Sequence, residues 1–229
     1  MASTNSGERT GLDLGSAEFT GTIQQGMDRV EAELRSSLSV GESFLTDKVS
    51  HLAKAGGKRF RPMFALIASR YGDRAMSDEV VSGAVVVELT HLATLYHDDV
   101  MDEADRRRGA ESANARWDNS VAILAGDYIF AVASRLMADL GTETVRHFAD
   151  TFGELVTGQM RETIGCGPEE DPVEYYMTVI QEKTGVLIAS AGFLGALHGG
   201  ASPEHRDALF RFGRHLGQVF QIVDDIIDI

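Results

Sequence analysis

The chain is built around residues 77–109, which read SDEVVSGAVVVELTHLATLYHDDVMDEADRRRG. At 3.6 residues per turn of a helix, Glu88, His91, Asp98, Asp99 and Asp102 fall on one face, and most other positions are apolar. Because the opposite side is apolar as well, we expect this polar stripe to line an interior cavity. Carboxylates clustered in such a cavity need cations, so the pattern predicts a metal site.

The composition is that of one globular domain. The 229 residues are 43% hydrophobic and 24% charged, and the net charge is −14. This acidity disfavours nucleic acid as a partner and general adhesion to anionic lipid. A single cysteine, Cys166, excludes an internal disulfide and fits a reducing compartment. The first residues lack the apolar core of a signal peptide, and no apolar run reaches about 18 residues, so we expect a cytoplasmic protein without a transmembrane segment.

The pattern of apolar residues predicts an all-α fold. Residues 1–18 are rich in Ser, Gly and Thr and predict a mobile tail, followed by one domain over 19–229. We expect helices at 19–38, 42–54, 62–71, 77–103, 120–140, 142–164, 172–198 and 203–229, with a polar connector at 110–119 and no alternating strand. Ser77 is the expected N-cap of the helix at 77–103. This helix and the one at 172–198 are apolar nearly all round, as expected at the centre of a bundle.

The last residues repeat the acidic pattern of the first helix. GQVFQIVDDIIDI, residues 217–229, places Gln221, Asp224, Asp225 and Asp228 at i, i+3, i+4 and i+7 of an otherwise apolar helix. A solvated helix face would explain one DDxxD cluster, but two on apolar helices favour carboxylates that face each other. Oxygen ligands without His or Cys suit Mg²⁺, which binds through carboxylates together with substrate phosphates.

Two groups of basic residues stand out: one follows a pair of glycines, and the other follows the first aspartate cluster. GGKRFRP supplies Lys58, Arg59 and Arg61, and the first aspartate cluster is followed by Arg106–Arg108. In an acidic chain these groups predict phosphate binding, with Arg59 and Arg106 expected to be solvated at the surface. His91 is either a core histidine or a phosphate contact, and its alignment with the aspartates favours the contact.

Taken together, GGKRFRP, HDDVMDEADRRRG, the pair Lys183–Thr184 and GQVFQIVDDIID resemble the trans-isoprenyl diphosphate synthases (polyprenyl synthetases) over residues 56–228. The resemblance implies an isoprenoid-synthase-like helical bundle with a central active-site cavity. It also suggests a homodimer, for which the helix at 120–140 is a candidate interface. Members usually continue beyond the second aspartate motif, so we expect the C-terminal helices to be missing and this chain to be weakly active or inactive.

The resemblance assigns roles to residues. The magnesium ions would be held by Asp98, Asp99, Asp102, Asp224, Asp225 and Asp228. The diphosphate of isopentenyl diphosphate would be bound by Lys58, Arg61, His91 and Arg108. The allylic diphosphate would be contacted by Arg107, Lys183, Thr184 and Gln221, with Gln159 as a further candidate. The implied catalytic set is Asp98, Asp99, Asp102, Lys183, Asp224 and Asp225.

The predicted function is a Mg²⁺-dependent condensation of isopentenyl diphosphate with an allylic diphosphate. Aromatic residues four or five positions before the first aspartate shorten the products of this family, and Ala93 and Thr94 stand there, so we expect products of geranylgeranyl length or longer. One alternative is a terpene cyclase, which the paired basic sites disfavour. Another is a non-catalytic partner subunit of a heteromeric synthase, which need not keep both aspartate clusters.

Overall fold

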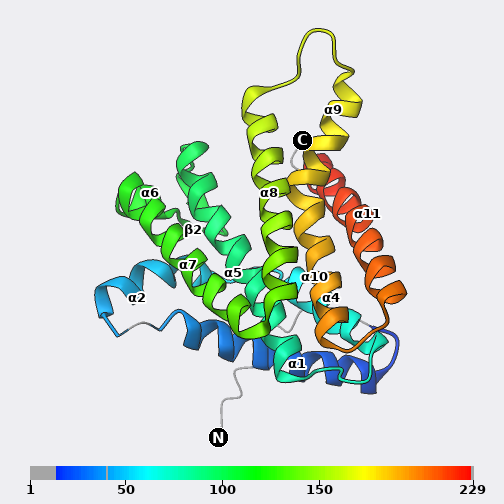
Figure 1. The fold of residues 1–229 in the computed structure, drawn as a ribbon. Coiled ribbons are helices and arrows are strands. Elements are labelled where there is room, and N and C mark those ends of the chain that lie inside the picture. The colour runs from blue at the N-terminus through cyan, green and yellow to red at the C-terminus, as the bar shows by residue number, and fades with distance from the viewer. Residues whose placement is uncertain (1–13, 40, 228–229) are drawn as a thin grey trace, which may run out of the picture.

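The computed structural model describes residues 14–39 and 41–227, and this part of the chain is almost entirely helical (Figure 1). The helices are α1 Ala17–Ser37, α2 Ser43–Val49, α3 His51–Lys54, α4 Phe60–Ala68, α5 Asp78–Met101, α6 Ala113–Arg116, α7 Asn119–Leu140, α8 Thr142–Ile164, α9 Pro172–Ile180, α10 Val186–His198 and α11 Pro203–Ile227. A 3₁₀ turn at Ser69–Tyr71 follows α4, and a π-helical turn at Gln181–Gly185 joins α9 to α10. The predicted all-α class is confirmed.

Local capping explains where the principal helices begin. The Ser77 side chain accepts a hydrogen bond from the backbone N–H of Val80 at 3.3 Å, so the predicted N-cap of α5 is confirmed. Asp171 caps α9 by accepting from Val173 and Glu174, each at 2.9 Å, and Pro172 occupies the first turn. These caps fix the register of the two helices whose far ends carry the predicted site residues.

Helices α5 and α10 form the centre of the bundle, as predicted (Figure 1). Glycines let α10 approach its neighbours closely. A Cβ added at Gly195 would lie 2.0 Å from the Ala65 carbonyl oxygen of α4, and one at Gly213 of α11 would lie 2.6 Å from the Ala189 Cα of α10. Because no side chain fits at these crossings, the close packing that holds α4 and α11 beside the centre depends on glycine.

Three segments differ from the sequence-based expectation. The connector at 110–119 contains part of a two-residue antiparallel ladder, β1 Arg106–Arg107 with β2 Ala110–Glu111, and the short helix α6. Ser112 organises it, because its hydroxyl donates to Ala104 O at 2.5 Å while it caps α6. The expected helix at 42–54 is divided at Ser50, and the one at 172–198 contains the π-helical turn. The spacing of apolar residues along the sequence does not predict such short interruptions of a helix.

The start of the described chain lies partly within the predicted tail. Helix α1 begins at Ala17 with Ser16 as its N-cap, so residues 17 and 18 are helical. Residues 1–13 lie outside the described part of the chain. The division into a tail at 1–18 and one domain at 19–229 therefore stays a prediction.

Two of the described helices, α5 and α7, match a membrane-spanning helix in length and composition. The most apolar stretch of α5 is 78% buried inside the bundle, as expected of a core helix. The corresponding stretch of α7 is only 39% buried, so α7 presents an apolar face outward. The absence of a transmembrane segment stays a prediction.

Candidate active site

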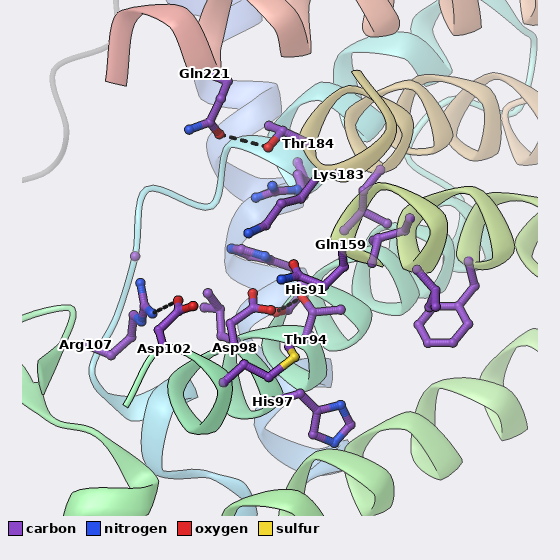
Figure 2. A pocket seen from close by; sticks show the side chains of 18 of the residues that line it. His91, Thr94, His97, Asp98, Asp102, Arg107, Gln159, Lys183, Thr184 and Gln221 are labelled. Carbon is purple, nitrogen blue, oxygen red and sulfur yellow. Dashed lines mark hydrogen bonds and ion pairs between the residues drawn. The ribbon is translucent and has the colours of Figure 1, made fainter. Parts of the chain in front are cut away.

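A cavity of about 1000 Å³ lies between α4, α5, α7, α8, the π-helical turn and α11 (Figure 2). Charged, polar and apolar side chains line this cavity. The charged and polar residues are Lys58, Arg59, Arg61, Glu88, His91, Thr94, His97, Asp98, Asp102, Arg107, Arg108, Asp127, Gln159, Thr163, Lys183, Thr184, Gln221 and Asp224. The apolar lining continues along α8 toward α7. Most of the sequence-predicted site residues are therefore brought together from five separate segments of the chain.

The first aspartate motif is divided by the helix that carries it. Asp98 and Asp102 line the cavity and lie one turn apart on α5. Asp99 is fully buried, does not line the cavity, and accepts a hydrogen bond from Arg107 Nε at 2.6 Å. Neighbouring helical residues point about 100° apart, and here Asp98 faces the cavity while Asp99 points into the core. Asp99 orients Arg107 instead.

The second aspartate motif is divided in the same way. Asp224 lines the cavity, with its Oδ1 atom 3.6 Å from Lys58 Nζ. Asp225 turns toward α9, where it accepts hydrogen bonds from the Tyr176 hydroxyl at 2.5 Å and from Gln221 Nε2 at 2.8 Å. Asp228 lies outside the described residues. Lys58 and Asp224 thus bring the loop before α4 against the end of α11.

The environment of the cavity changes the pKa of the Asp98 carboxyl group. Burial raises the pKa of Asp98 to about 6; the cation Lys183 opposes this shift and Asp102 adds to it. Burial also raises the pKa of Asp99, although its hydrogen bond to Arg107 acts in the other direction. A cation beside Asp98 would therefore relieve an electrostatic cost that the folded chain carries.

The carboxylates suit an ion that binds together with substrate. Within the described residues, no group of three His, Cys, Asp or Glu side chains is placed to hold a metal on its own. Mg²⁺ typically uses one or two protein carboxylates and completes its shell with water and phosphate oxygens. Asp98 and Asp102 offer such a pair, and in the described part of the chain Asp98 forms neither a hydrogen bond nor an ion pair through its carboxylate. The donor set therefore fits Mg²⁺ shared with a diphosphate.

A basic cluster, defined here as Arg61, His91 and Arg108, occupies another wall of the cavity. Among the described residues, the Nε atom of Arg61 is buried without a hydrogen-bond partner, and burial lowers the pKa of Arg61 to about 10. Burial, followed by the nearby cations Arg61 and Arg108, lowers the pKa of His91 well below its ordinary value. His91 is therefore neutral at pH 7 and can donate one N–H to an anion.

Arg59 corrects the sequence-based expectation that it is a solvated surface residue. Its side chain is 8% exposed and contacts Glu31 at 2.5 Å and Glu88 at 2.8 Å. Burial acts to lower the pKa of Arg59, but the two carboxylates outweigh it and raise the pKa. Arg59 also has φ of 48° at the N-cap of α4, where its contacts hold this left-handed conformation. Arg106 is exposed, as expected.

The residues predicted to contact an allylic diphosphate lie on the π-helical turn, on α8 and α11, and, for Arg107, on β1 (Figure 2). Thr184 donates a hydrogen bond to Gln221 Oε1 at 2.8 Å, and Arg107 Nη2 lies 3.8 Å from Asp102. Lys183 forms an ion pair with Glu162. The sequence analysis missed Glu162. A signal was present, because Glu162 follows Gln159 by three residues on α8 and shares its face.

The two positions predicted to set product length behave differently. Thr94 lines the cavity, and its hydroxyl donates to the His91 carbonyl at 2.9 Å. Ala93 is 2% exposed and does not line the cavity. It packs against α7, where a Cβ added at Gly126 would lie 3.1 Å from the Ala93 carbonyl oxygen. Only Thr94 can therefore limit the space in the cavity directly.

The apolar end of the cavity is formed mainly by one face of α8. Its lining residues there are Phe152, Leu155, Val156, Met160 and Ile164, opposite Ile123 of α7. Met160 is 59% exposed and Ile164 is 78% exposed, so this end opens to solvent in the described structure. An apolar chain attached to an anion in the charged part would lie along this face.

Comparisons with known proteins show the family to which the chain is similar. Residues 42–229 match the family described as Polyprenyl synthetase. The chain is 52% identical over 219 residues to nonaprenyl diphosphate synthase of Mycobacterium tuberculosis, covering 96% of this chain and 65% of the relative. A crystal structure of geranylgeranyl pyrophosphate synthase from Corynebacterium glutamicum, complexed with calcium and isoprenyl diphosphate, superposes with a TM-score of 0.86 at 64% identity, covering 95% of this chain and 67% of that one. A decaprenyl diphosphate synthase from Rhodobacter capsulatus superposes with a TM-score of 0.85 at 36% identity, covering 92% and 65%.

These likenesses place the molecule among proteins with the helical isoprenoid-synthase fold. The chain belongs to the polyprenyl synthetase family. It spans about two thirds of the length of the relatives it matches, namely 65% of the M. tuberculosis nonaprenyl diphosphate synthase and 67% of the C. glutamicum structure.

Proposed function

We propose that this chain carries the substrate-binding and metal-binding core of a trans-prenyltransferase, which condenses isopentenyl diphosphate with an allylic diphosphate. One observation carries the proposal. A single cavity contains carboxylates on α5 and α11, a separate basic cluster, and an apolar end along α8. Two diphosphates and one hydrocarbon tail match these three regions in charge and polarity.

The allylic diphosphate fits the side of the cavity with the carboxylates. Asp98, Asp102 and Asp224 would hold Mg²⁺ there, and Lys183 and Arg107 would contact the phosphate oxygens directly. When bound, Mg²⁺ neutralises the negative charge that develops on the diphosphate as the allylic C–O bond breaks. Lys183 and Arg107 stabilise the same charge, because their positions are fixed by Glu162 and Asp99 before substrate arrives.

Isopentenyl diphosphate fits the basic cluster. Arg61 and Arg108 supply fixed positive charge, and neutral His91 supplies one hydrogen-bond donor. Lys58 lies nearer the second aspartate motif, at 3.6 Å from Asp224, and connects the two diphosphate sites. The double bond of isopentenyl diphosphate then attacks the allylic cation, and loss of a proton leaves a chain one isoprene unit longer. The departing diphosphate is the base that this arrangement offers.

The product is proposed to be of geranylgeranyl length or longer. Thr94 is small where it lines the cavity, and the apolar face of α8 continues past it. The relatives carry names for different lengths, since nonaprenyl and geranylgeranyl synthases both match closely. Product length therefore needs direct measurement.

A homodimer in the cytoplasm completes the proposal. Helix α7 exposes Leu124 at 66%, and its most apolar stretch is largely uncovered. Apolar residues on one helix face are typical of an interface between identical subunits. The acidic composition and the single cysteine support a reducing, aqueous compartment.

The test is incubation of the protein with labelled isopentenyl diphosphate, allylic primers of several lengths and Mg²⁺, followed by chromatographic sizing. Binding of each diphosphate is measured alongside by calorimetry, with and without Mg²⁺. We expect isopentenyl diphosphate to bind without metal, the allylic diphosphate to require it, and Asp98→Asn to weaken only the allylic one. Failure of the chain to bind either diphosphate would contradict the proposal.

The same assay separates the rival functions. A terpene cyclase would consume the allylic diphosphate alone and release a hydrocarbon, with no incorporation of isopentenyl label. A partner subunit would bind diphosphates and leave them unchanged until a second polypeptide was added. Elongation of the primer by labelled isoprene units distinguishes the proposed function from both.

A further inference from the structure

Glu88 is a carboxylate on a wall that otherwise attracts anions. It lies one turn before His91 on α5, lines the cavity, and is 2% exposed. Its Oε1 atom is 2.8 Å from Arg59 Nη1 and 3.8 Å from Arg108 Nη2. A negative charge at this place repels any phosphate that the basic cluster binds, and burial limits how far solvent screens it.

The cations around Glu88 have other partners that fix their positions. Arg59 donates to Glu31 at 2.5 Å, to the Ala53 carbonyl at 2.9 Å and to the Gly56 carbonyl at 3.3 Å. Arg108 donates to the Gly56 carbonyl and to the Leu52 carbonyl, the latter at 3.5 Å. Because these contacts do not involve Glu88, orientation of the arginines does not by itself account for a buried carboxylate here.

The proposed reaction suggests a role for the negative charge of Glu88. The diphosphate of isopentenyl diphosphate is not cleaved, so after each condensation it remains attached to the elongated product. It must leave the basic cluster before another isopentenyl diphosphate can enter. A cluster that bound it too tightly would stop after one condensation.

We propose that Glu88 is a positioned counter-charge that weakens the basic cluster for diphosphate, so that the elongated product leaves after each condensation. The inference rests on the proposed function and adds a residue that sets how many condensations follow one another. For a unit charge about 7 Å from the ligand, at an effective dielectric constant of about 20, the change in affinity is on the order of fiftyfold, and screening reduces it toward fivefold.

The test compares three variants by metal-free calorimetric titration with isopentenyl diphosphate. Glu88→Gln removes the charge and keeps the shape, and Glu88→Met is a second charge-free variant should the first not fold. Glu88→Asp keeps the charge and lengthens the contact to Arg59. Glu31→Gln is the matched control, because Glu31 also pairs with Arg59 but does not line the cavity.

We expect the charge-free variants to bind isopentenyl diphosphate five- to fiftyfold more tightly, and Glu88→Asp and Glu31→Gln to remain within about twofold of the unchanged protein. In the elongation assay, Glu88→Gln should release the elongated product more slowly after each condensation and yield shorter products. Equal or weaker binding by a folded charge-free variant overturns the inference, as does tighter binding by Glu88→Asp. If the unchanged protein binds no isopentenyl diphosphate, the proposed function itself fails, so the two failures are distinguishable.

Discussion

Acidification should weaken the contact between α8 and α10 through two buried histidines. His147 Nε2 lies 3.0 Å from Ser190 Oγ, and its ring stacks on Phe193 with centroids 4.0 Å apart. His198 Nε2 lies 3.0 Å from Thr144 Oγ1, and the residue is 8% exposed. Burial lowers the pKa of each histidine from 6.5 to about 4, so both are neutral in the folded chain at pH 7.

The sign and size follow from proton uptake. Between pH 6.5 and 4 the unfolded chain protonates these histidines and the folded chain does not, so the free energy of unfolding falls as the pH falls. Between pH 6.5 and pH 5, an interval of about 1.5 pH units, the free energy of unfolding falls by about 2 kcal/mol per histidine. Asp98 acts in the opposite direction, because its pKa is raised to about 6 and the folded chain binds that proton more readily. The wild-type curve therefore contains both contributions, and a comparison of variants is required.

The assay is urea unfolding followed by far-ultraviolet circular dichroism at pH 8, 7, 6 and 5. His147→Gln and His198→Gln keep a hydrogen-bonding side chain but do not titrate, and each should reduce the loss of stability between pH 8 and 5 by about 2 kcal/mol. His215→Gln is the control, because His215 is exposed on α11. If the double variant loses as much stability on acidification as the unchanged protein, the histidines do not carry the effect.

Four substitutions test other parts of the structure. Thr94→Phe should shorten the products because Thr94 lines the cavity, whereas Ala93→Phe should cost about 1–3 kcal/mol of stability because Ala93 is buried against α7; product sizing and urea unfolding distinguish these outcomes, and unchanged lengths with Thr94→Phe would contradict the assignment. Gly195→Ala should destabilise the chain by about 3 kcal/mol, because its Cβ would lie 2.0 Å from the backbone of α4; an unchanged or increased stability would show that the crossing can relax. Arg59→Ala should cost about 3–5 kcal/mol, since it deprives buried Glu88 of its nearest cation, and an unchanged unfolding midpoint would be inconsistent with that pairing.

The sequence predicts the helices because they depend on local periodicity, and it predicts much of the cavity lining through the resemblance of its motifs to a known family. Ser77 and the apolar turns after it specify α5, and the spacing of Asp98 and Asp102 places both on one face. Spacing is less informative about adjacent residues. Asp99 and Asp225 belong to the same motifs as Asp98 and Asp224, yet each turns out of the cavity toward a partner of its own.

Long-range partners explain why the prediction of a solvated Arg59 was wrong. Arg59 sits between Lys58 and Arg61 in a short basic segment, and nothing in that segment distinguishes the three side chains. Its partners, Glu31 and Glu88, lie 28 and 29 residues away. Burial of Arg59 depends on where α1 and α5 meet the loop before α4, which is a property of the packed bundle.

The π-helical turn at Gln181–Gly185 makes the helix that carries Lys183 and Thr184 one residue longer than regular α-helical winding would require. Removing one residue there would restore a continuous α-helix but would rotate α9 relative to α10 by about 100°. Tyr176 would then turn away from Asp225, and either Lys183 or the buried face of α10 would lose its place. The extra residue therefore lets one helix combine two rotational phases: its first half directs Tyr176 toward Asp225, and its second half buries α10 in the core.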